Sequence, residues 1–248
     1  MPTVRAIWRH PIKAHGRESL TQVELLEGQT MPWDRAFAVA HELSDADGSA
    51  WAHCRKFTRA SAVPSVQAIN AQVDGATGQL TLSHPALDDL TFDPDQEQDA
   101  FLTWVRTIMP VAKPQSVRLV RSQAQGMTDT NYPSVSLINL ASHAAVAALT
   151  SPDLSILRWR CNIHMDGLEA WEEFDWVGKT IRAGQAELRI EEPIERCEVP
   201  AANPETGAQD TDIVGTLMRG FGHMNFGISA VVTKSGALAV GDVVEPVG

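Results

Sequence analysis

Short apolar segments, each bounded by glycine, proline or aspartate, recur along this chain and constrain its fold more than any other feature. The expected strands are residues 4–8, 36–40, 67–73, 79–83, 116–121, 134–139, 162–165, 186–191, 226–233 and 237–240. Residues 75–78, Gly-Ala-Thr-Gly, are typical of a hairpin connection, and Lys234-Ser235-Gly236 predicts a closing hairpin. Because isolated short strands are unstable, the pattern predicts a mostly β (α+β) protein with a barrel or strongly curled sheet.

Three segments instead have the spacing of helices. Asp93-Pro94-Asp95 supplies capping signals before an apolar face at residues 101–109. Ser142 is expected to cap a helix that runs to Leu149, and residues 213–221 predict a short amphipathic helix. We expect these helices on the outside of the sheet.

A polar stretch at residues 123–133 divides the chain. We interpret it as a linker or surface loop, which predicts one domain at residues 1–122 and a second at residues 123–248. A chain of 248 residues is long enough for one large domain or two small ones with a real core.

Charge and cysteine content exclude several classes of protein. Asp and Glu total 31 against 20 Lys and Arg, and the net charge of -11 argues against nucleic acid or an anionic membrane as the main partner. No apolar run is long enough to span a bilayer, and residues 1–13 lack the apolar core of a secretory signal. The three cysteines form no CxxC pair, which argues against a disulfide framework or structural zinc and favours a reducing, cytoplasmic compartment.

Cys197 is the first candidate for chemistry. It follows an alternating strand in the run Pro193-Ile194-Glu195-Arg196-Cys197, and a nearby cation such as Arg196 favours the reactive thiolate. Neighbours on a strand face oppositely, so Arg196 need not point toward the thiol. The alternative is a buried structural thiol, and position alone favours it.

Basic residues form two further candidate groups. In Arg158-Trp159-Arg160-Cys161-Asn162, arginines two positions apart share a face if the segment is a strand, and forked guanidinium groups suit phosphate. Lys13 and Arg35 adjoin strands and could converge on one anion. From these residues alone, the first group is better interpreted as a solvated strand end in which Trp159 is buried. Lys13 and Arg35 are better interpreted as unrelated surface charges.

Other polar groups give weaker signals. Glu169, Glu172 and Glu173 around Trp171 are interpreted as a solvated edge, and His223 as a solvated or lid residue in a loop. Cys54 lies in the first half, away from any metal motif. The chain has no HExxH spacing and no phosphate-binding glycine loop.

Taken together and in order, several motifs resemble one family. They are Pro11-Ile12-Lys13, Asp34-Arg35, Ser134-Val135-Ser136-Leu137, Arg158-Trp159-Arg160-Cys161-Asn162-Ile163, Trp171-Glu172-Glu173, Arg196-Cys197, Asn203-Pro204-Glu205-Thr206-Gly207, Phe226-Gly227 and Val240-Gly241-Asp242. The second half is similar to the MOSC domain, which is shared with the C-terminal part of molybdenum cofactor sulfurases. The first half is similar to the MOSC N-terminal β-barrel domain of the mitochondrial amidoxime-reducing component and its bacterial relatives. The resemblance implies an N-terminal β-barrel-like domain followed by a MOSC β-barrel with short peripheral helices.

The resemblance also implies a bound molybdenum cofactor, in which molybdopterin carries the metal. Cys197 then matches the family's metal ligand and catalytic residue. The positions that match cofactor-binding residues are Lys13, Arg35, Ser136, Arg160, Asn162 and Arg196. This sequence departs from the family pattern at Trp159 and Cys161, at Ala14 after the lysine, and at Glu195, whose carboxylate is expected to repel an anionic cofactor unless it points away.

The activity that the resemblance implies is reduction of N-hydroxylated small molecules, with electrons from a separate ferredoxin-like protein or flavin reductase. The chain lacks a dinucleotide fingerprint and the four cysteines of an iron–sulfur cluster, so we expect no NAD(P)H-driven turnover by the chain alone. Two alternatives remain: a sulfur-transfer module with a persulfide on Cys197, and a cofactor carrier without turnover. Nucleic acid and membrane are not expected partners. We expect Lys13, Arg35 and Arg160 to converge on one cleft between the two halves.

Overall fold

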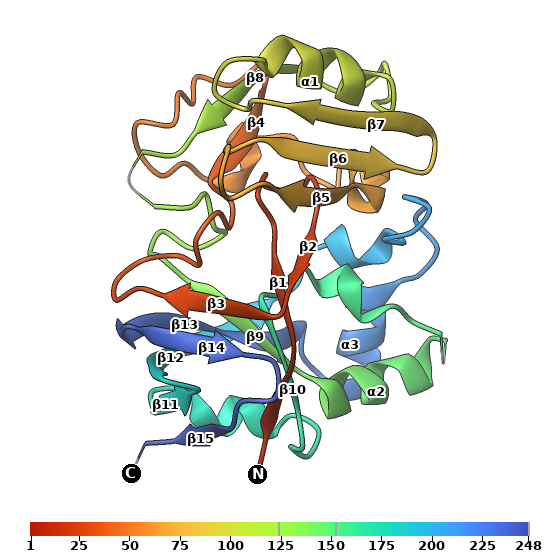
Figure 1. Cartoon of the computed structure of the whole chain (residues 1–248). Coiled ribbons are helices and arrows are strands. Elements are labelled where there is room, and N and C mark those ends of the chain that lie inside the picture. Colours follow the sequence, from red (N-terminus) through yellow and green to blue (C-terminus); the bar gives the residue numbers. More distant parts are fainter. Residues whose placement is uncertain (124, 152, 248) are drawn as a thin grey trace.

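The computed structural model describes residues 1–123, 125–151 and 153–247. Its largest element is an eight-stranded sheet in the order β15-β11-β12-β13-β9-β10-β1-β2, in the lower part of Figure 1. The strands are β1 (Thr3–Arg9), β2 (Glu18–Leu20), β9 (Val135–Asn139), β10 (Ile163–Asp166), β11 (Thr180–Ala183), β12 (Ala186–Glu195), β13 (Asn225–Lys234) and β15 (Val244–Pro246). Strands β9 and β10 run parallel, whereas β10 pairs with β1 and β9 with β13 in antiparallel fashion.

The sheet curls around an apolar core because its strands alternate. In β12, Leu188 and Ile190 are buried, whereas Arg189 is exposed. A two-stranded sheet of β3 (Gln22–Leu25) and β14 (Gly236–Ala239) adds Leu25 and Leu238 to the same core. The small sheet therefore covers the inner face of the large one.

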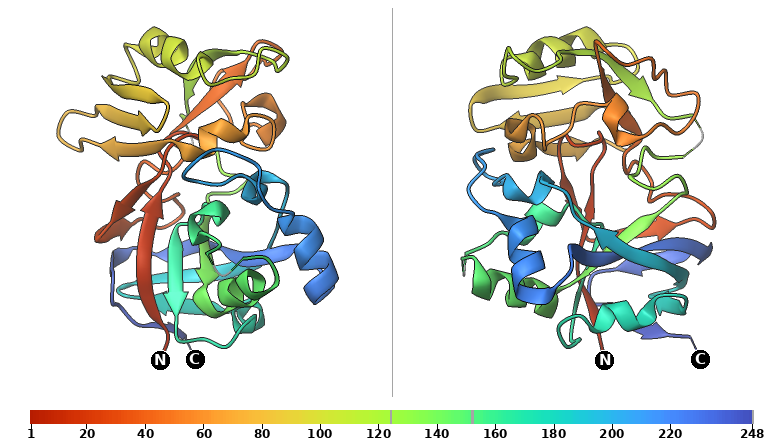
Figure 2. Two further views of the ribbon diagram at one scale, coloured as in Figure 1. Left: turned by 90° about the vertical axis from the view of Figure 1, so that its right-hand side faces the viewer. Right: turned by 180° about the vertical axis from the view of Figure 1, so that it is seen from behind.

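The upper part of the molecule has a second core of its own. It contains the pair β4 (Phe37–His41) and β8 (Ser116–Arg121), the meander β5 (Asn70–Val73), β6 (Leu80–His84) and β7 (Leu87–Phe92), and the helix α1 (Gln98–Arg106). Helix α1 contacts β7 and β8, and it buries Phe101, Leu102 and Val105. Figure 2 shows this part above the large sheet in both views.

The other α-helices lie on one flank of the lower part (Figure 2). They are α2 (Leu140–Leu149) and α3 (Ile213–Phe221), which contact each other. Short 3₁₀ turns complete the described chain: η1 (Cys54–Lys56), η2 (Pro64–Ala68), η3 (Ile156–Trp159), η4 (Glu172–Trp176) and η5 (Val199–Ala201). The expected mostly β fold with short peripheral helices is confirmed. No helix in the described part of the chain has the length and apolarity needed to cross a membrane.

The two halves of the sequence share strands. Strands β1 and β2 belong to the large sheet, and β3 pairs with β14, so these strands of the first half are built into the lower part, whereas Ile12 between them packs in the upper core. The domain boundary at residues 122 and 123 stays a prediction.

Two expected strand features differ in the structure. The expected strand at 67–73 begins only at Asn70, because Gln67 and Ala68 belong to η2. The expected closing hairpin is wrong: after the turn at residues 234–236, β14 pairs with β3 instead of β13. The pairing of β14 with β3 buries Leu238 in the lower core, and this burial requires β14 to cross over the inner face of the large sheet.

The helices and one loop also differ from expectation. Helix α1 begins later than expected, at Gln98, after a turn in which the Glu97 amide donates to the Asp93 carbonyl. Helix α2 is capped by Asn139, whose side chain accepts from the Ala141 amide, and not by Ser142. The expected surface loop at 123–133, apart from Ala124, which lies outside the described residues, is partly interior because residues 126–128 are buried.

Candidate functional site

A cavity of about 330 Å³ gathers the candidate residues from both halves of the chain. Its lining includes Lys13, Arg35, Ser136, Arg160, Asn162, Arg196 and Cys197. Lys13, Arg35 and Arg160 therefore converge on one cleft, as expected. The volume falls within the range of small-molecule sites, whereas the roles of these residues stay predictions.

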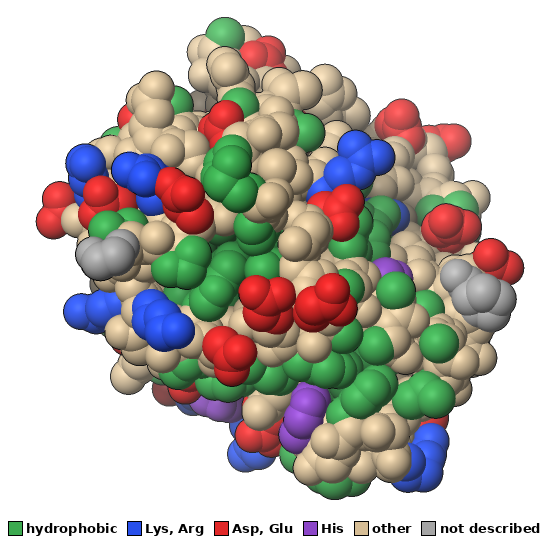
Figure 3. Space-filling model, turned by 90° about the horizontal axis from the view of Figure 1, so that it is seen from below, with side chains coloured by type: hydrophobic (Ala, Val, Ile, Leu, Met, Phe, Trp, Pro, Cys, Tyr) green, Lys and Arg blue, Asp and Glu red, His purple; other side chains and the backbone are tan. Residues whose placement is uncertain are grey.

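The charge of this cavity is opposite to that of the protein. Five cationic side chains line it, Lys13, Arg35, Arg59, Arg160 and Arg196, against two carboxylates, Asp129 and Glu195. The chain as a whole carries a net charge of -11, and acidic side chains are prominent on the underside of the molecule (Figure 3). A cationic cavity in an acidic protein favours a small anionic ligand.

A tight turn after β1 places Lys13. Its amide donates to the Phe37 carbonyl at 2.7 Å, and the next residue, Ala14, has φ of 65°. The buried Lys13 ammonium donates to the Met127 carbonyl at 2.7 Å and to Asp129 Oδ1 at 2.5 Å. The lysine therefore faces a segment that lies more than a hundred residues away in the sequence.

Arg35 is held by its neighbours on three sides. Its backbone has φ of 51°, its amide donates to the His10 carbonyl at 2.7 Å, and its guanidinium donates to Asp34 and to the Arg160 carbonyl at 3.0 Å. Burial alone raises the pKa of Asp34, but the Arg35 charge and hydrogen bonds from His10 hold that pKa well below its usual range. The ion pair fixes the guanidinium in the cavity wall.

Among the cations of the cavity, Arg160 has the surroundings that most favour binding of an anion. It follows η3 with φ of 51°, and its Nη2 donates to the Gly16 carbonyl at 3.0 Å. Its Nη1 is buried and has no hydrogen-bond partner among the residues that the structure describes. Burial, together with the charges of Arg35 and Arg17, lowers the pKa of Arg160 to about 9. An anion in the cavity would satisfy this donor and stabilise its charge.

Arg158 does not join Arg160, which corrects the expectation of a shared strand face. The segment is a 3₁₀ turn rather than a strand. Arg158 instead donates to the Pro200 and Ala201 carbonyls at 3.2 Å and pairs with Asp210 at 2.7 Å. Trp159 is buried, as expected.

Ser136 and Asn162 form one hydrogen-bonded unit. Asn162 Oδ1 accepts from the Ser136 amide at 3.0 Å and from its hydroxyl at 2.8 Å, and Asn162 Nδ2 donates to the Trp8 carbonyl at 3.1 Å. The unit ties β9 to the end of β1.

Cys197 and Arg196 follow the end of β12 and have different surroundings. Cys197 is exposed in the cavity, which excludes the alternative of a buried structural thiol. Arg196 donates to the carbonyls of Trp159 at 2.9 Å and Phe226 at 2.6 Å, and to Cys161 Sγ at 3.1 Å. Its guanidinium also lies over both aromatic rings. Arg196 therefore lines the cavity while its guanidinium is held by hydrogen bonds to the protein.

All three cysteines line this cavity, including Cys54, which lies away from any metal motif in the sequence. Cys54 is half-buried at the start of η1, and Cys161 is buried. Sequence distance gave no hint of this, because tertiary packing alone brings η1 to the cavity. Among the described residues no three His, Cys, Asp or Glu side chains could together hold a metal ion. A metal at Cys197 would therefore need ligands that the protein does not supply.

Two polar residues are less solvated than expected. Glu173 is buried, accepts from Asn139 Nδ2 at 2.9 Å and from the Ser142 hydroxyl at 2.7 Å, and has its pKa raised by burial. His223 packs against the rings of Trp171 and Phe174, with centroids 5.1 and 5.6 Å away. Both side chains therefore support the fold around α2 and η4.

Sequence reasoning missed two charged residues of the site. Asp129 belongs to the stretch interpreted as a linker, and its polar composition gave no signal of a role. Arg59 precedes η2 and adds a cation from the first half of the chain. Only the packing of the two halves reveals either residue.

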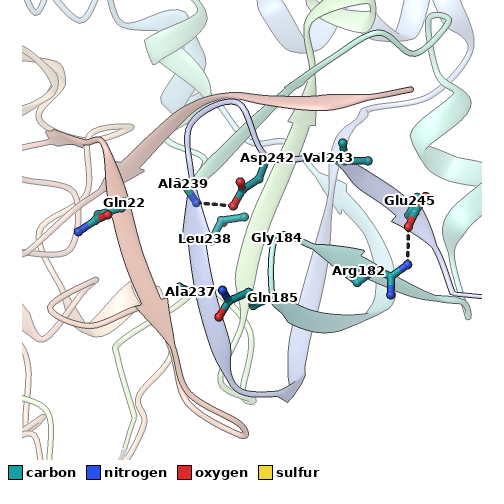
Figure 4. A pocket seen from close by; sticks show the side chains of 10 residues that line it. All are labelled: Gln22, Arg182, Gly184, Gln185, Ala237, Leu238, Ala239, Asp242, Val243 and Glu245. Carbon is teal, nitrogen blue, oxygen red and sulfur yellow. Dashed lines mark hydrogen bonds and ion pairs between the residues drawn. The ribbon is translucent and has the colours of Figure 1, made fainter.

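A second cavity, of about 430 Å³, lies beside β11, β14 and β15, and Figure 4 shows its lining. Its charged groups already have partners in the protein: Arg182 pairs with Glu245, and Asp242 accepts from the Ala239 amide at 2.8 Å. Among the described residues its lining contains no thiol and no histidine. The larger volume therefore does not make it the better candidate for chemistry.

Comparisons with known proteins agree with the motifs. Molybdenum cofactor sulfurase 3 of Aedes aegypti is 25% identical, over 92% of this chain and 33% of its own length. The molybdenum cofactor sulfurase of Drosophila pseudoobscura pseudoobscura is 32% identical, over 49% of this chain and 16% of its own length. The matches thus span a third or less of the length of these curated relatives.

Among solved structures, the YuaD protein of Bacillus subtilis has a TM-score of 0.47 and 12% identity, covering 98% of this chain and 94% of its own. YiiM of Geobacillus stearothermophilus has a TM-score of 0.37 and 16% identity, covering 46% and 54%. The family models described as the MOSC domain and the MOSC N-terminal beta barrel domain match residues 127–245 and 1–112. These two matches together span nearly the whole sequence, and the chain therefore belongs to the MOSC domain family, with the N-terminal β-barrel domain ahead of the MOSC domain.

Proposed function

We propose that this protein binds the molybdenum cofactor in the cationic cavity and acts as a molybdenum-dependent oxidoreductase on N-hydroxylated small molecules. The observation that carries the proposal is one cavity that joins the exposed Cys197 thiol to five cationic side chains. The relatives named molybdenum cofactor sulfurases link the family to this cofactor.

The residues present suit such a group. A thiolate is a soft ligand that suits a soft, redox-active metal, and the protein offers no competing cluster of ligands among its described residues. The unpartnered Nη1 of Arg160, together with Lys13 and Arg35, suits the phosphate of a pterin cofactor. Ser136 and Asn162 offer further polar contacts. When bound, the cofactor supplies a metal that cycles between oxidised and reduced states.

The net reaction consumes two electrons and two protons. A hydroxylamine R–NHOH becomes the amine R–NH₂ and water, so the N–O bond breaks and its oxygen leaves as water. The residues of this chain bind and orient the reactants, and a separate ferredoxin-like protein or flavin reductase supplies the electrons. We also propose a cytoplasmic location, because the three free thiols of this protein persist as thiols in a reducing compartment.

A sulfur-transfer module is the second candidate function. Two observations favour it: the relatives are named sulfurases, and all three thiols of this chain line one cavity. Cys197 would then carry a persulfide and bind no metal. A third possibility, a cofactor carrier, would bind the metal without turnover. Metal analysis separates sulfur transfer from the other two, and turnover of an amidoxime with a supplied electron donor separates enzyme from carrier.

Substitution of Cys197 tests the proposal directly. We expect Cys197→Ser, expressed in a host that makes the cofactor, to lose bound molybdenum and activity while remaining folded, because a hydroxyl is a hard and poorly ionised ligand. The measurements are molybdenum content, pterin fluorescence and circular dichroism.

Two variants in the same cavity provide the controls. Cys54→Ser and Cys161→Ser are expected to keep most of their molybdenum, because neither position matches the family's ligand. Equal molybdenum in all three variants would show that no cysteine holds the cofactor. Loss in Cys161→Ser alone would move the ligand to that residue.

A further inference from the structure

The ammonium of Lys13 has one fixed and one movable partner. Its side chain is 6% exposed, and the Met127 carbonyl that it contacts belongs to buried backbone. The carboxylate of Asp129, 2.5 Å away, is 75% exposed. A buried ammonium is costly without a counter-charge, so the Asp129 carboxylate balances Lys13 in the absence of a ligand.

The backbone around Asp129 is anchored, whereas its side chain is not. The Met127 amide donates to the Arg35 carbonyl at 2.8 Å, and Trp51 Nε1 donates to the Thr128 carbonyl at 3.0 Å. The Asp129 carboxylate is held by its contact with Lys13. A rotation of one side chain is therefore enough to free the ammonium, without movement of the surrounding backbone.

The position of this carboxylate makes it a competitor for anions. Arg35 and Arg196 also lie close enough to attract it, so Asp129 stands among three cations that line the cavity. An anion that approaches Lys13 must either displace Asp129 or bind beside a like charge, and both are unfavourable. The unpartnered Nη1 of Arg160, in contrast, meets no such obstacle.

We propose that Asp129 is a built-in counter-ion of Lys13 that an entering anionic ligand displaces, and that it excludes small inorganic anions from the cavity. The proposal rests on the assignment of this cavity to an anionic cofactor. A large ligand gains contacts at Arg160, Asn162 and Cys197 that offset the loss of the Lys13–Asp129 pair. Inorganic phosphate has only the cationic cluster and gains too little.

Calorimetric titration of inorganic phosphate into the full chain, made in a host that lacks the cofactor, tests this role. We expect Asp129→Asn to bind phosphate about tenfold more tightly than the parent, because the competing charge is gone. The matched control is Glu195→Gln, which removes the other carboxylate of the same cavity, one that does not contact Lys13. We expect Glu195→Gln to raise the affinity for phosphate by about twofold at most. The double variant Asp129→Asn/Lys13→Gln should lose the gain.

Equal gains in Asp129→Asn and Glu195→Gln would overturn the proposal, since they would show only a general charge effect. A gain that survives in the double variant would overturn it as well. If Asp129→Asn does not fold, Asp129→Ser takes its place in the same titration, and a phosphate affinity equal to that of the parent would refute the proposal. Molybdenum content of the parent from a cofactor-producing host tests the proposed function separately, because it does not depend on the phosphate result.

Discussion

Arg196 shows how a single residue that lines the cavity can also organise the surrounding structure. Its guanidinium bridges η3 and β13 through the carbonyls of Trp159 and Phe226, and it contacts the thiol of Cys161. A planar fork can satisfy several acceptors at once while stacking on aromatic rings. Since Arg196 precedes Cys197, these contacts also fix where the chain enters the cavity.

We expect Arg196→Lys to lower the free energy of unfolding by about 1–3 kcal/mol, because an ammonium cannot reach both carbonyls and stack on the two rings. Urea denaturation followed by circular dichroism measures this. Arg182→Lys, at an exposed ion pair, is the control and should change the value by less than about 0.5 kcal/mol. Similar values for the two variants would contradict the bridging role.

At the scale of elements, the loop at residues 203–207 connects the two halves of the molecule. Arg17 donates to the Pro204 carbonyl at 2.7 Å and to the Gln67 carbonyl at 2.6 Å, which joins the loop to η2. Gly207 has φ of 71°, and a Cβ built there would lie 2.6 Å from Ser65 Cα. Glycine at this position therefore permits both the turn and the close approach of the two halves.

We expect Gly207→Ala to destabilise the protein by about 1–3 kcal/mol, because it adds a steric clash with η2 to the strain of a positive φ. Gly178→Ala separates the two effects: its φ is 81°, but a Cβ there meets nothing within 4 Å. Gly178→Ala should therefore cost less, about 1 kcal/mol. Urea unfolding of both variants provides the comparison, and equal losses would argue against tight packing between loop and η2.

For the molecule as a whole, the burial of histidine side chains makes the stability depend on pH. Burial lowers the pKa of His10 to about 3 and that of His15 and His164 to about 4, with the charge of Arg160 adding to the effect at His10. In the unfolded chain these rings bind protons near pH 6.5. Below that pH the unfolded state binds more protons than the folded state, so the stability falls as the pH falls.

We expect the free energy of unfolding to decrease from pH 6.5 toward pH 4 by about 1.4 kcal/mol per pH unit for each such histidine. Glu173 acts in the opposite sense, because its raised pKa favours the folded state at low pH and this contribution is lost as the pH rises past its unfolded value of 4.5. Urea unfolding at pH 6.5, 5.5 and 4.5 checks the slope. A flat profile in the parent would contradict the assignment.

The sequence by itself determined the features that depend on neighbouring residues. Side-chain alternation predicted β12, apolar spacing predicted α3, and the position of Cys197 directly after an alternating strand was evident, whereas its exposure was not. Local patterns suffice here because the period of a strand or helix is set within a few residues. The same patterns carried the resemblance to the MOSC family.

The tertiary structure alone decided which of these features meet. Lys13 contacts Asp129, which is 116 residues away in the sequence, and Arg160 donates to the Gly16 carbonyl, which is 144 residues away. Strand β14 pairs with β3 and not with β13, its neighbour in the sequence. The left-handed backbone of Arg160, which turns it away from Arg158, is also imposed by packing, since local preference disfavours it. Contacts between distant segments depend on the burial of a shared core, and no local sequence pattern encodes which segments meet. The cationic cavity and its three thiols are assembled only when the two halves of the chain pack together.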